Sequence, residues 1–252
     1  MINFKALRVA PPPAKVAYCK GLEGFTLAEV LITIGIIGVV AAMTLPSVIL
    51  NYQEKATMTK VKKAYSIINQ AYQKASFDNG GMLDSWDCDK KISSENTGCL
   101  YQFFTKYFNN IKTCGERPCK ITFQIVGSTG QNMTNSGPAF YTALADGITI
   151  FWYDSYENIY IITSGFKATE TNSTTPIKLI ANKNSFHLSL YSDRPKAGTM
   201  ACGDSWDPVN LYKGGPGNGC PASAVDWIMK YENMDYLHCA QKMKDNGTNS
   251  CK

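Results

Sequence analysis

Glu29 is the residue whose type and position most clearly require a chemical partner. It is the one ionisable side chain between Phe25 and Leu50, in the stretch FTLAEVLITIGIIGVVAAMTLPSVIL. A charged side chain at the centre of a bilayer costs about 2.5–3.5 kcal/mol on insertion scales, and less towards the interface. A carboxylate one helical turn inside an apolar segment therefore needs a cationic partner.

A backbone cut between Gly24 and Phe25 would supply that partner. It would expose an α-ammonium group four residues before Glu29, at the positive end of the helix dipole. The ammonium group could neutralise the carboxylate within one chain or between chains, and a pair between chains would also set their axial stagger. The alternative is that Glu29 lies in the headgroup region of an uncut signal anchor.

The stretch GFTLAEVLITIGIIGVVAAMTLP closely resembles the processing and methylation motif of type IV prepilins and type II secretion pseudopilins. The resemblance implies that Gly24 precedes the scissile bond and that Phe25 becomes the N-methylated N-terminus. It also implies that Glu29 neutralises the N-terminus of a neighbouring subunit, and that the helix has a kink or a locally melted turn at Pro46.

The resemblance covers about residues 21 to 50, and it has two departures. Glu23 stands where the family often has a lysine or arginine, and a 24-residue leader is long for a prepilin of this kind. An ordinary secretory signal is the competing interpretation, with Val40-Ala41-Ala42 before a cut at Met43. The helical pattern continues well past that site, and signal cores normally have no carboxylate.

Two helical segments must position this motif. Residues 25–48 are predicted to form a transmembrane helix, since the 21 residues from Phe25 to Leu45 rise about 30 Å, the thickness of the hydrocarbon core. Residues 51–77 are predicted to form an amphipathic helix. Its apolar residues recur with spacings of three and four at Met58, Val61, Tyr65, Ile68, Tyr72 and Ala75, with Ala64 and Ala71 beside them. We expect one rod that ends at Asp78-Asn79-Gly80-Gly81, with its apolar stripe on a sheet.

Composition limits the class of protein. The chain has 252 residues, a net charge of +5 and 18% charged residues, which excludes a disordered polyelectrolyte and gives no reason to expect a nucleic-acid partner. Basic residues before and after the span nearly balance, so they do not decide its orientation. Eight of nine cysteines follow residue 87, which favours an oxidising compartment for the C-terminal part.

The remainder of the chain is predicted to be an extracytoplasmic head with a small antiparallel sheet. Short alternating runs predict strands at residues 120–126, 140–144, 148–153, 158–163 and 185–191, with a hairpin turn at Asp146-Gly147. The predicted fold class is therefore α+β, with a long N-terminal helix packed on a disulfide-rich head, as the pilin resemblance also implies. The predicted divisions are a leader at 1–24, a helix at 25–79 and a head at 80–252.

Eight cysteines remain after loss of Cys19 with the leader, enough for four disulfides. The candidates are Cys88, Cys99, Cys114, Cys119, Cys202, Cys220, Cys239 and Cys251. Short loops favour pairing Cys114 with Cys119 and Cys88 with Cys99. The pilin resemblance implies a C-terminal disulfide from Cys220 to Cys239, which would leave Cys202 for Cys251.

Metal, cofactor and catalytic sites are not expected. The place where pseudopilin-like heads can bind calcium reads Thr163-Ser164-Gly165-Phe166-Lys167, without the needed carboxylate. Asp84, Asp87 and Asp89 are not followed by the glycine turn and bidentate glutamate of a calcium loop. Zinc is a weak alternative for Cys114 and Cys119. No catalytic motif occurs, and His187 is expected to be structural.

The sequence therefore predicts a filament subunit of a type IV pilus or type II secretion pseudopilus. Its expected partners are other pilin subunits, a prepilin peptidase, an inner-membrane assembly platform and membrane lipid. We expect single-pass insertion in the cytoplasmic membrane with the head outside, followed by assembly. The alternative is a tethered or secreted disulfide-rich adhesin or binding domain that does not polymerise.

Overall fold

In the computed structural model the chain divides into two units, residues 1–49 and Leu50–Lys252. The described residues are 24–81, 86, 101, 103, 105–108, 110–113, 119–120, 123–127, 132–135, 138–153, 158–165, 177–190, 195–196, 209, 212 and 223–252. The leader, apart from Gly24, lies outside them.

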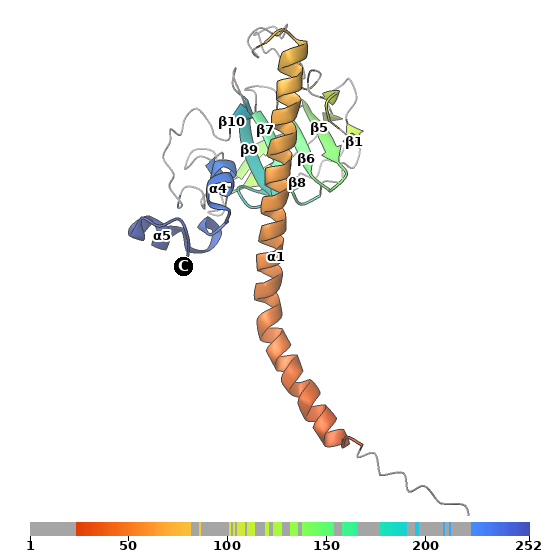
Figure 1. The fold of residues 1–252 in the computed structure, drawn as a ribbon, viewed down its shortest axis with the longest axis vertical. Helices are drawn as coiled ribbons and strands as arrows, with labels where there is room; N and C mark the ends of the chain where they lie inside the picture. The colour runs from red at the N-terminus through yellow and green to blue at the C-terminus, as the bar shows by residue number, and fades with distance from the viewer. Residues whose placement is uncertain are drawn as a thin grey trace, which may run out of the picture. The chain divides into compact units, whose positions relative to one another are not determined.

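Helix α1 runs from Leu27 to Asp78, 52 residues without a break (Figure 1). The predicted rod is thus confirmed. Its end follows from the sequence because Gly80 and Gly81 take positive φ angles of 82° and 122°, which glycine adopts without strain. The Gly81 N–H donates to the Ser76 carbonyl over 2.8 Å, and this bond satisfies one of the last free carbonyl groups of the helix.

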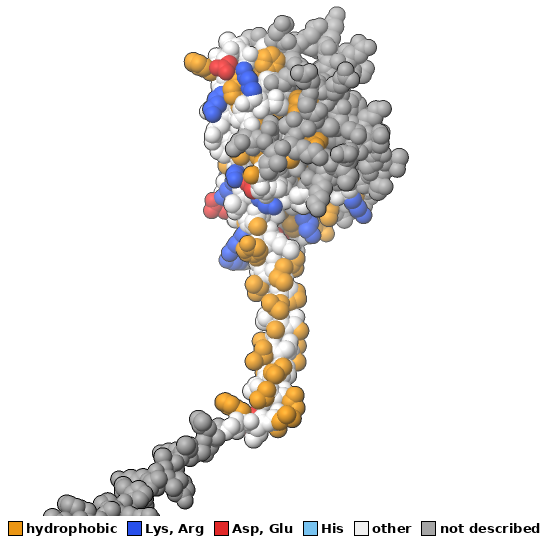
Figure 2. Space-filling model, turned by 90° about the vertical axis from the view of Figure 1, so that its right-hand side faces the viewer, with side chains coloured by type: hydrophobic (Ala, Val, Ile, Leu, Met, Phe, Trp, Pro, Cys, Tyr) orange, Lys and Arg blue, Asp and Glu red, His pale blue; other side chains and the backbone are white. Residues whose placement is uncertain are grey.

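The part of α1 in the first unit is apolar and exposed. Large hydrophobic side chains along residues 27–49 are exposed, from 43% at Val30 to 78% at Leu27, and Figure 2 shows them along the helix. Among the described residues, α1 is the one helix long and apolar enough to cross a membrane. A signal sequence near the N-terminus would have the same properties.

The head contains a seven-stranded antiparallel sheet. Its strands are β1 (Asn110–Thr113), β2 (Cys119–Lys120), β5 (Pro138–Leu144), β6 (Thr149–Tyr153), β7 (Asn158–Ile162), β9 (Ser185–Leu190) and β10 (Pro195–Lys196). The order is β1-β5-β6-β7-β9-β10, and β2 also pairs with β5. Strands β5 and β6 join through the predicted hairpin, where Gly147 has a φ of 75° and its N–H donates to the Leu144 carbonyl over 3.2 Å.

A second, three-stranded sheet was not predicted. It has the order β4 (Asn132–Asn135), β3 (Phe123–Val126) and β8 (Ile177–Ile180), and β8 lies parallel to β3. The prediction of one strand over residues 120–126 was wrong, since Lys120 belongs to β2 in the main sheet and Phe123 begins β3 in the second sheet.

The main sheet is buried on both faces, because alternate residues of its strands join two different apolar clusters. One cluster joins α1 to the sheet and the C-terminal helices; it includes Val61, Ala64, Ile68, Ala71, Tyr72 and Ala75 of α1 with Phe140, Ile150, Trp152, Ile159, Ile161, Phe186 and Leu188. The other joins the two sheets and contains Phe123, Ile125, Tyr141, Phe151, Ile162, Leu179 and Ala181. The apolar stripe of α1 therefore packs on the sheet as predicted.

Two C-terminal helices complete the described head. Helix α4 runs from Ser223 to Tyr231 and buries Trp227 and Ile228 in the cluster that contains α1. Helix α5 runs from Tyr236 to Asn246 and ends at Gly247, whose φ is 62°. The coarse prediction of an α+β fold with a long N-terminal helix and a small antiparallel sheet is confirmed.

Candidate functional site

The N-terminal motif lies at the start of α1. Gly24, Phe25 and Thr26 precede the helix, and the Phe25 side chain is 88% exposed. A Cβ added to Gly24 would meet no atom within 4 Å. The Gly24–Phe25 bond is thus in accessible chain directly before the helix begins.

Thr26 and Glu29 form a capping box that the sequence analysis missed. The Thr26 N–H and hydroxyl donate to Glu29 Oε2 over 2.8 and 2.9 Å, and the Glu29 N–H donates back to Thr26 Oγ1 over 3.3 Å. The signal was present, because threonine followed by glutamate three residues later is the sequence pattern of this cap. Glu29 therefore has a local structural role in addition to the predicted pairing role.

Pro46 lies inside α1, and the helix is continuous through it. The melted turn that the resemblance implied at this position is not present in the described helix. The missing N–H of a proline removes one hydrogen bond from a helix interior. The chain accommodates this loss without ending the helix.

Three lysines of one helical turn join α1 to separate parts of the head. Lys60 Nζ donates to the Thr163 carbonyl at the end of β7 over 2.9 Å. Lys62 contacts Glu232, in the link between α4 and α5, over 2.5 Å. Lys63 contacts Asp146, in the β5–β6 hairpin, over 2.6 Å.

The acids of these pairs have lowered pKa values. The hydrogen bond and the charge of Lys62 lower the pKa of Glu232. Burial favours the neutral form of Asp146, but the hydrogen bond from Lys63 and nearby backbone N–H groups hold its pKa below the usual value. These lysines are among the basic residues after the predicted span that left its orientation undecided. In the structure they contact the head.

A groove of about 750 Å³ lies between the first turns of α1 in the head, the β8–β9 turn and α5. Its lining includes apolar side chains from each element: Leu50, Ala56, Ile180, Ala181, Met234 and Leu237. Its polar lining includes Glu54, Lys60, Lys183 and His238. Sequence analysis missed this groove, because its walls come from segments more than 100 residues apart and no short motif marks them.

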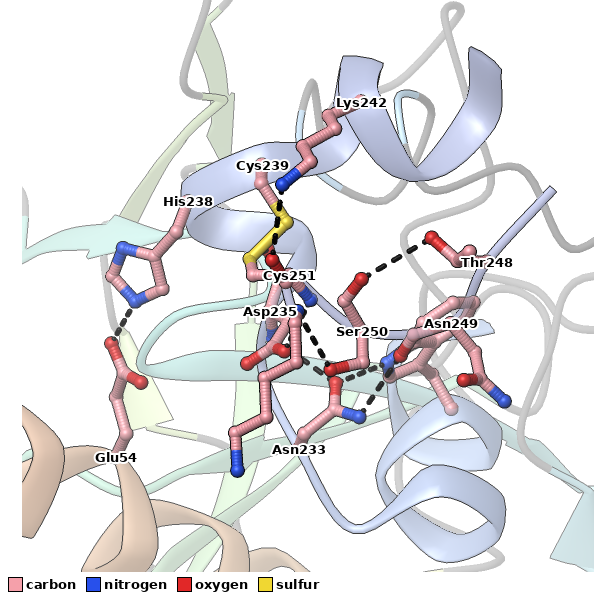
Figure 3. The surroundings of a disulfide bond; sticks show 12 residues. Glu54, Asn233, Asp235, His238, Cys239, Lys242, Thr248, Asn249, Ser250 and Cys251 are labelled. Atoms are coloured by element: carbon pink, nitrogen blue, oxygen red, sulfur yellow. Dashed lines mark hydrogen bonds and ion pairs between the residues drawn. A yellow bond between two sulfur atoms is a disulfide. The ribbon is translucent and has the colours of Figure 1, made fainter. Parts of the chain in front are cut away.

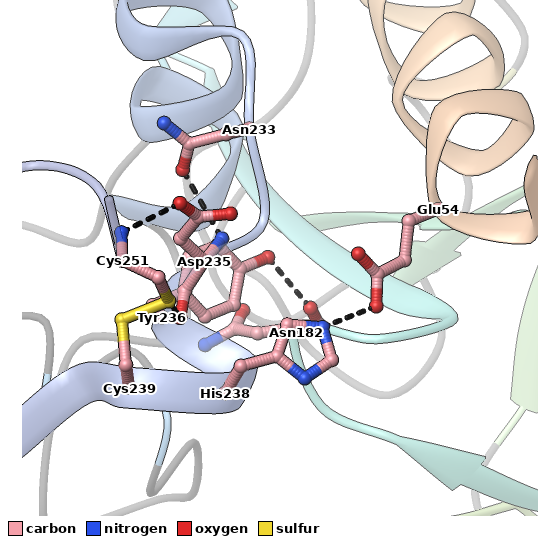
Figure 4. A network of polar contacts seen from close by, with 8 residues as sticks. All are labelled: Glu54, Asn182, Asn233, Asp235, Tyr236, His238, Cys239 and Cys251. Carbon is pink, nitrogen blue, oxygen red and sulfur yellow. Dashed lines mark hydrogen bonds and ion pairs between the residues drawn. A yellow bond between two sulfur atoms is a disulfide. The ribbon is translucent and has the colours of Figure 1, made fainter. Parts of the chain in front are cut away.

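Polar contacts fix the wall that α5 contributes to the groove (Figure 4). His238 Nε2 lies 2.6 Å from Glu54 Oε1 of α1. The Tyr236 hydroxyl donates to the Asn182 carbonyl of the β8–β9 turn over 2.7 Å. Tyr236 is fully buried, and burial raises its pKa, so the hydroxyl remains a donor at ordinary pH. Asn182 has a φ of 57°, which asparagine tolerates better than most residues.

The C-terminus is joined to α5 by a disulfide between Cys239 and Cys251 (Figure 3). The pairing of Cys220 with Cys239 and of Cys202 with Cys251 is therefore wrong. Asp235 supports the observed closure, since its Oδ2 accepts the Cys251 N–H over 2.8 Å. The Asn233 side chain adds a bond from Nδ2 to the Asn249 carbonyl over 3.0 Å.

The other cysteine predictions are not tested. Cys88, Cys99, Cys114, Cys202 and Cys220 lie outside the described residues, and Cys119 is described through its backbone in β2. The pairings within 88–99 and 114–119 stay predictions.

His187 lies in β9 and is buried, with its ring centroid 4.9 Å from that of Tyr160. Burial lowers its pKa to about 4, so the imidazole is neutral at pH 7. The part of the chain that the structure describes holds no cluster of three metal-ligating side chains. The aspartates at 84, 87 and 89 lie outside that part.

Comparison with known proteins identifies one family. Residues 47–197 match the model of a family of unknown function, DUF6613. The match begins directly after Pro46 and includes the head portion of α1 and the strands. No curated protein and no solved structure matches the chain.

Proposed function

The chain belongs to this family of unknown function, DUF6613, and we propose that it is a filament subunit of the type IV pilin or pseudopilin kind. A prepilin peptidase cuts after Gly24, Phe25 is methylated, and an inner-membrane platform extracts the subunit into a filament. The head lies outside the cytoplasm. The protein is a substrate of these enzymes and not itself an enzyme.

The observation that carries the proposal is a single carboxylate within an exposed apolar helix, four residues after an accessible Gly–Phe bond. The exposed hydrophobic residues of 27–49 have no partner surface within the described part of their own unit. Burying them against the same segment of other subunits removes apolar surface from water or lipid and drives lateral packing.

The pairing of Glu29 with a neighbouring ammonium group sets the register of this packing. A carboxylate has about four acceptor positions. The two contacts that Thr26 makes with Oε2 therefore leave room for an ammonium group. A buried carboxylate without a cation is strongly unfavourable, so only a stagger that brings the two charges together is stable.

Two features of the head support its placement outside the cytoplasm. The Cys239–Cys251 disulfide favours an oxidising compartment. Lysines just after a span ordinarily favour the cytoplasmic side of the membrane. Here Lys60, Lys62 and Lys63 contact the head, so their position has a structural cause that does not depend on orientation.

Mass spectrometry of the mature N-terminus in the native host tests the proposal. We expect a chain that begins with methylated Phe25. A chain that begins at Met43, or that keeps residues 1–24, would instead support the tethered or secreted binding domain.

A further inference from the structure

The groove beside Glu54 and His238 begins where the predicted span ends. Leu50, Tyr52 and Glu54 lie two to six residues after residue 48, roughly 3–9 Å further along a helix. The headgroup layer on each side of a bilayer is about 5–8 Å thick. This end of the groove is therefore at the level of lipid headgroups when the helix spans a membrane.

The β8–β9 turn and α5 contribute the other walls of the groove. His238 contacts Glu54 over 2.6 Å, and Tyr236, two residues earlier, donates to the Asn182 carbonyl over 2.7 Å. Lys183 follows Asn182 in the turn, is exposed and lines the groove.

The charges of the lining favour an anion. Two lysines, Lys60 and Lys183, line the groove together with one acid, Glu54, and that acid is in contact with His238. Apolar side chains of Leu50, Met234 and Leu237 lie in the same lining. An occupant that complements these walls has an anionic group joined to an apolar part, and the volume of about 750 Å³ is in the range of small-molecule sites.

We propose that this groove holds the headgroup of an anionic phospholipid, with the phosphate at Lys183 and the start of the acyl chains on Leu50 and Leu237. The inference rests on the membrane insertion in the proposed function.

Native mass spectrometry of the full mature chain tests this site. The protein is purified in mild detergent and mixed with equal amounts of phosphatidylglycerol and phosphatidylcholine that have the same acyl chains. We expect phosphatidylglycerol to be retained preferentially. Because one lysine near an anionic lipid is worth about 1 kcal/mol, Lys183→Gln should lower that retention about fivefold.

Lys178→Gln is the matched control, because Lys178 is an exposed lysine of β8 that does not line the groove. It changes the net charge equally and should leave lipid retention unchanged. Equal retention of both lipids by the wild type, or equal behaviour of the two variants, would overturn the proposal.

Hydrogen exchange of residues 181–184 gives a second readout that does not depend on a variant. Phosphatidylglycerol nanodiscs should protect this turn more than phosphatidylcholine nanodiscs. If inorganic phosphate alone protects the turn and phosphatidylglycerol is not preferred, the groove is a free-phosphate site. If protection occurs only in assembled filaments, the groove is a subunit interface. Either result removes the lipid proposal.

These experiments distinguish failure of the lipid site from failure of the proposed function. A chain that begins with methylated Phe25 but shows no lipid preference leaves the filament proposal intact. A chain that keeps its leader yet retains phosphatidylglycerol through Lys183 supports the lipid site alone.

Discussion

At the scale of the residue, Glu29 combines a local role with a proposed intermolecular one. Its carboxylate accepts the Thr26 N–H and hydroxyl, which stabilises the first turn of α1. The proposed pair with a neighbouring ammonium group uses the same carboxylate. The two roles predict different behaviour for two variants.

We expect Glu29→Ala to insert into the membrane but to be lost from filaments, because no carboxylate remains to pair with the ammonium group. Thr26→Ala removes the hydroxyl of the capping box and keeps the carboxylate, so it should lower helix stability by about 1 kcal/mol and still assemble. Membrane fractionation and quantification of each variant in sheared filaments check both outcomes. If both variants are lost equally, the defect of Glu29→Ala comes from the cap and not from charge pairing.

His187 predicts a pH dependence of head stability. Its pKa is about 4 in the fold against an ordinary value of 6.5, so the unfolded chain binds a proton in this interval that the native state does not. Stability is therefore full above about pH 6.5 and falls as the pH decreases towards 4. The free energy of unfolding should fall by about 2 kcal/mol between pH 7 and pH 5 because of this group.

His187→Phe keeps an aromatic contact with Tyr160 and should remove most of this slope in urea unfolding at several pH values. The lowered pKa values of Asp146 and Glu232 cause losses of stability mainly below their ordinary values of 3.8 and 4.5, so they contribute little between pH 7 and pH 5. An unchanged slope in His187→Phe would show that another group titrates there.

At the scale of the element, α1 fits the sheet because its stripe contains small residues. Ala64, Ala71 and Ala75 are buried against the sheet and allow close approach of the helix backbone. A leucine at one of these positions has no space to occupy in a packed core.

We expect Ala64→Leu to destabilise the head by about 1–3 kcal/mol through overpacking. Gln73→Leu is the matched control, since Gln73 is exposed on the same helix, and its effect should stay within about 0.5 kcal/mol. Urea unfolding followed by tryptophan fluorescence measures both. Equal stability of the two variants would mean that the helix can shift on the sheet.

The elements that sequence analysis predicted are those with a strong local pattern. Helix α1, the strands at 140–144, 148–153, 158–163 and 185–191, and the turn at Gly147 have periodicity or turn residues that act within a few residues. Strand β8 was missed because its four residues, Ile177–Ile180, are too short a run to show a clear period and its parallel partner β3 is about 50 residues away.

Helices α4 and α5 were missed for a different reason. Apolar residues at Ala224, Val225, Trp227 and Ile228 have helical spacing, but the segment was considered only as the region that a Cys220–Cys239 disulfide would enclose, and no helix was predicted there. Spacing alone does not determine disulfide connectivity, and the observed partner of Cys239 is Cys251. The groove was not predictable, since contacts such as Glu54 with His238 form only after folding.

At the scale of the whole molecule, the two units have different relations to solvent. Residues 27–49 expose their large hydrophobic side chains, while the buried core of the head includes α1 residues only from Val61 onwards. The head therefore contains its own core and does not need the first unit to fold.

A chain of residues 50–252 should remain monomeric in buffer without detergent, whereas the full chain should need detergent. Size-exclusion chromatography measures the first property, and near-ultraviolet circular dichroism of the buried tryptophans checks that the fold is kept. The full chain in detergent is the control for the native spectrum. Aggregation of the shorter chain with loss of that spectrum would show that the head depends on residues before Leu50.

The turn of α1 from Lys60 to Lys63 contacts β7, the β5–β6 hairpin and the α4–α5 link. A tensile load applied along the helix axis would be divided between the sheet, through Thr163 and Asp146, and the α4–α5 link, through Glu232. A force that withdraws the proposed filament subunit from lipid would therefore be shared among these three contacts rather than borne by one strand.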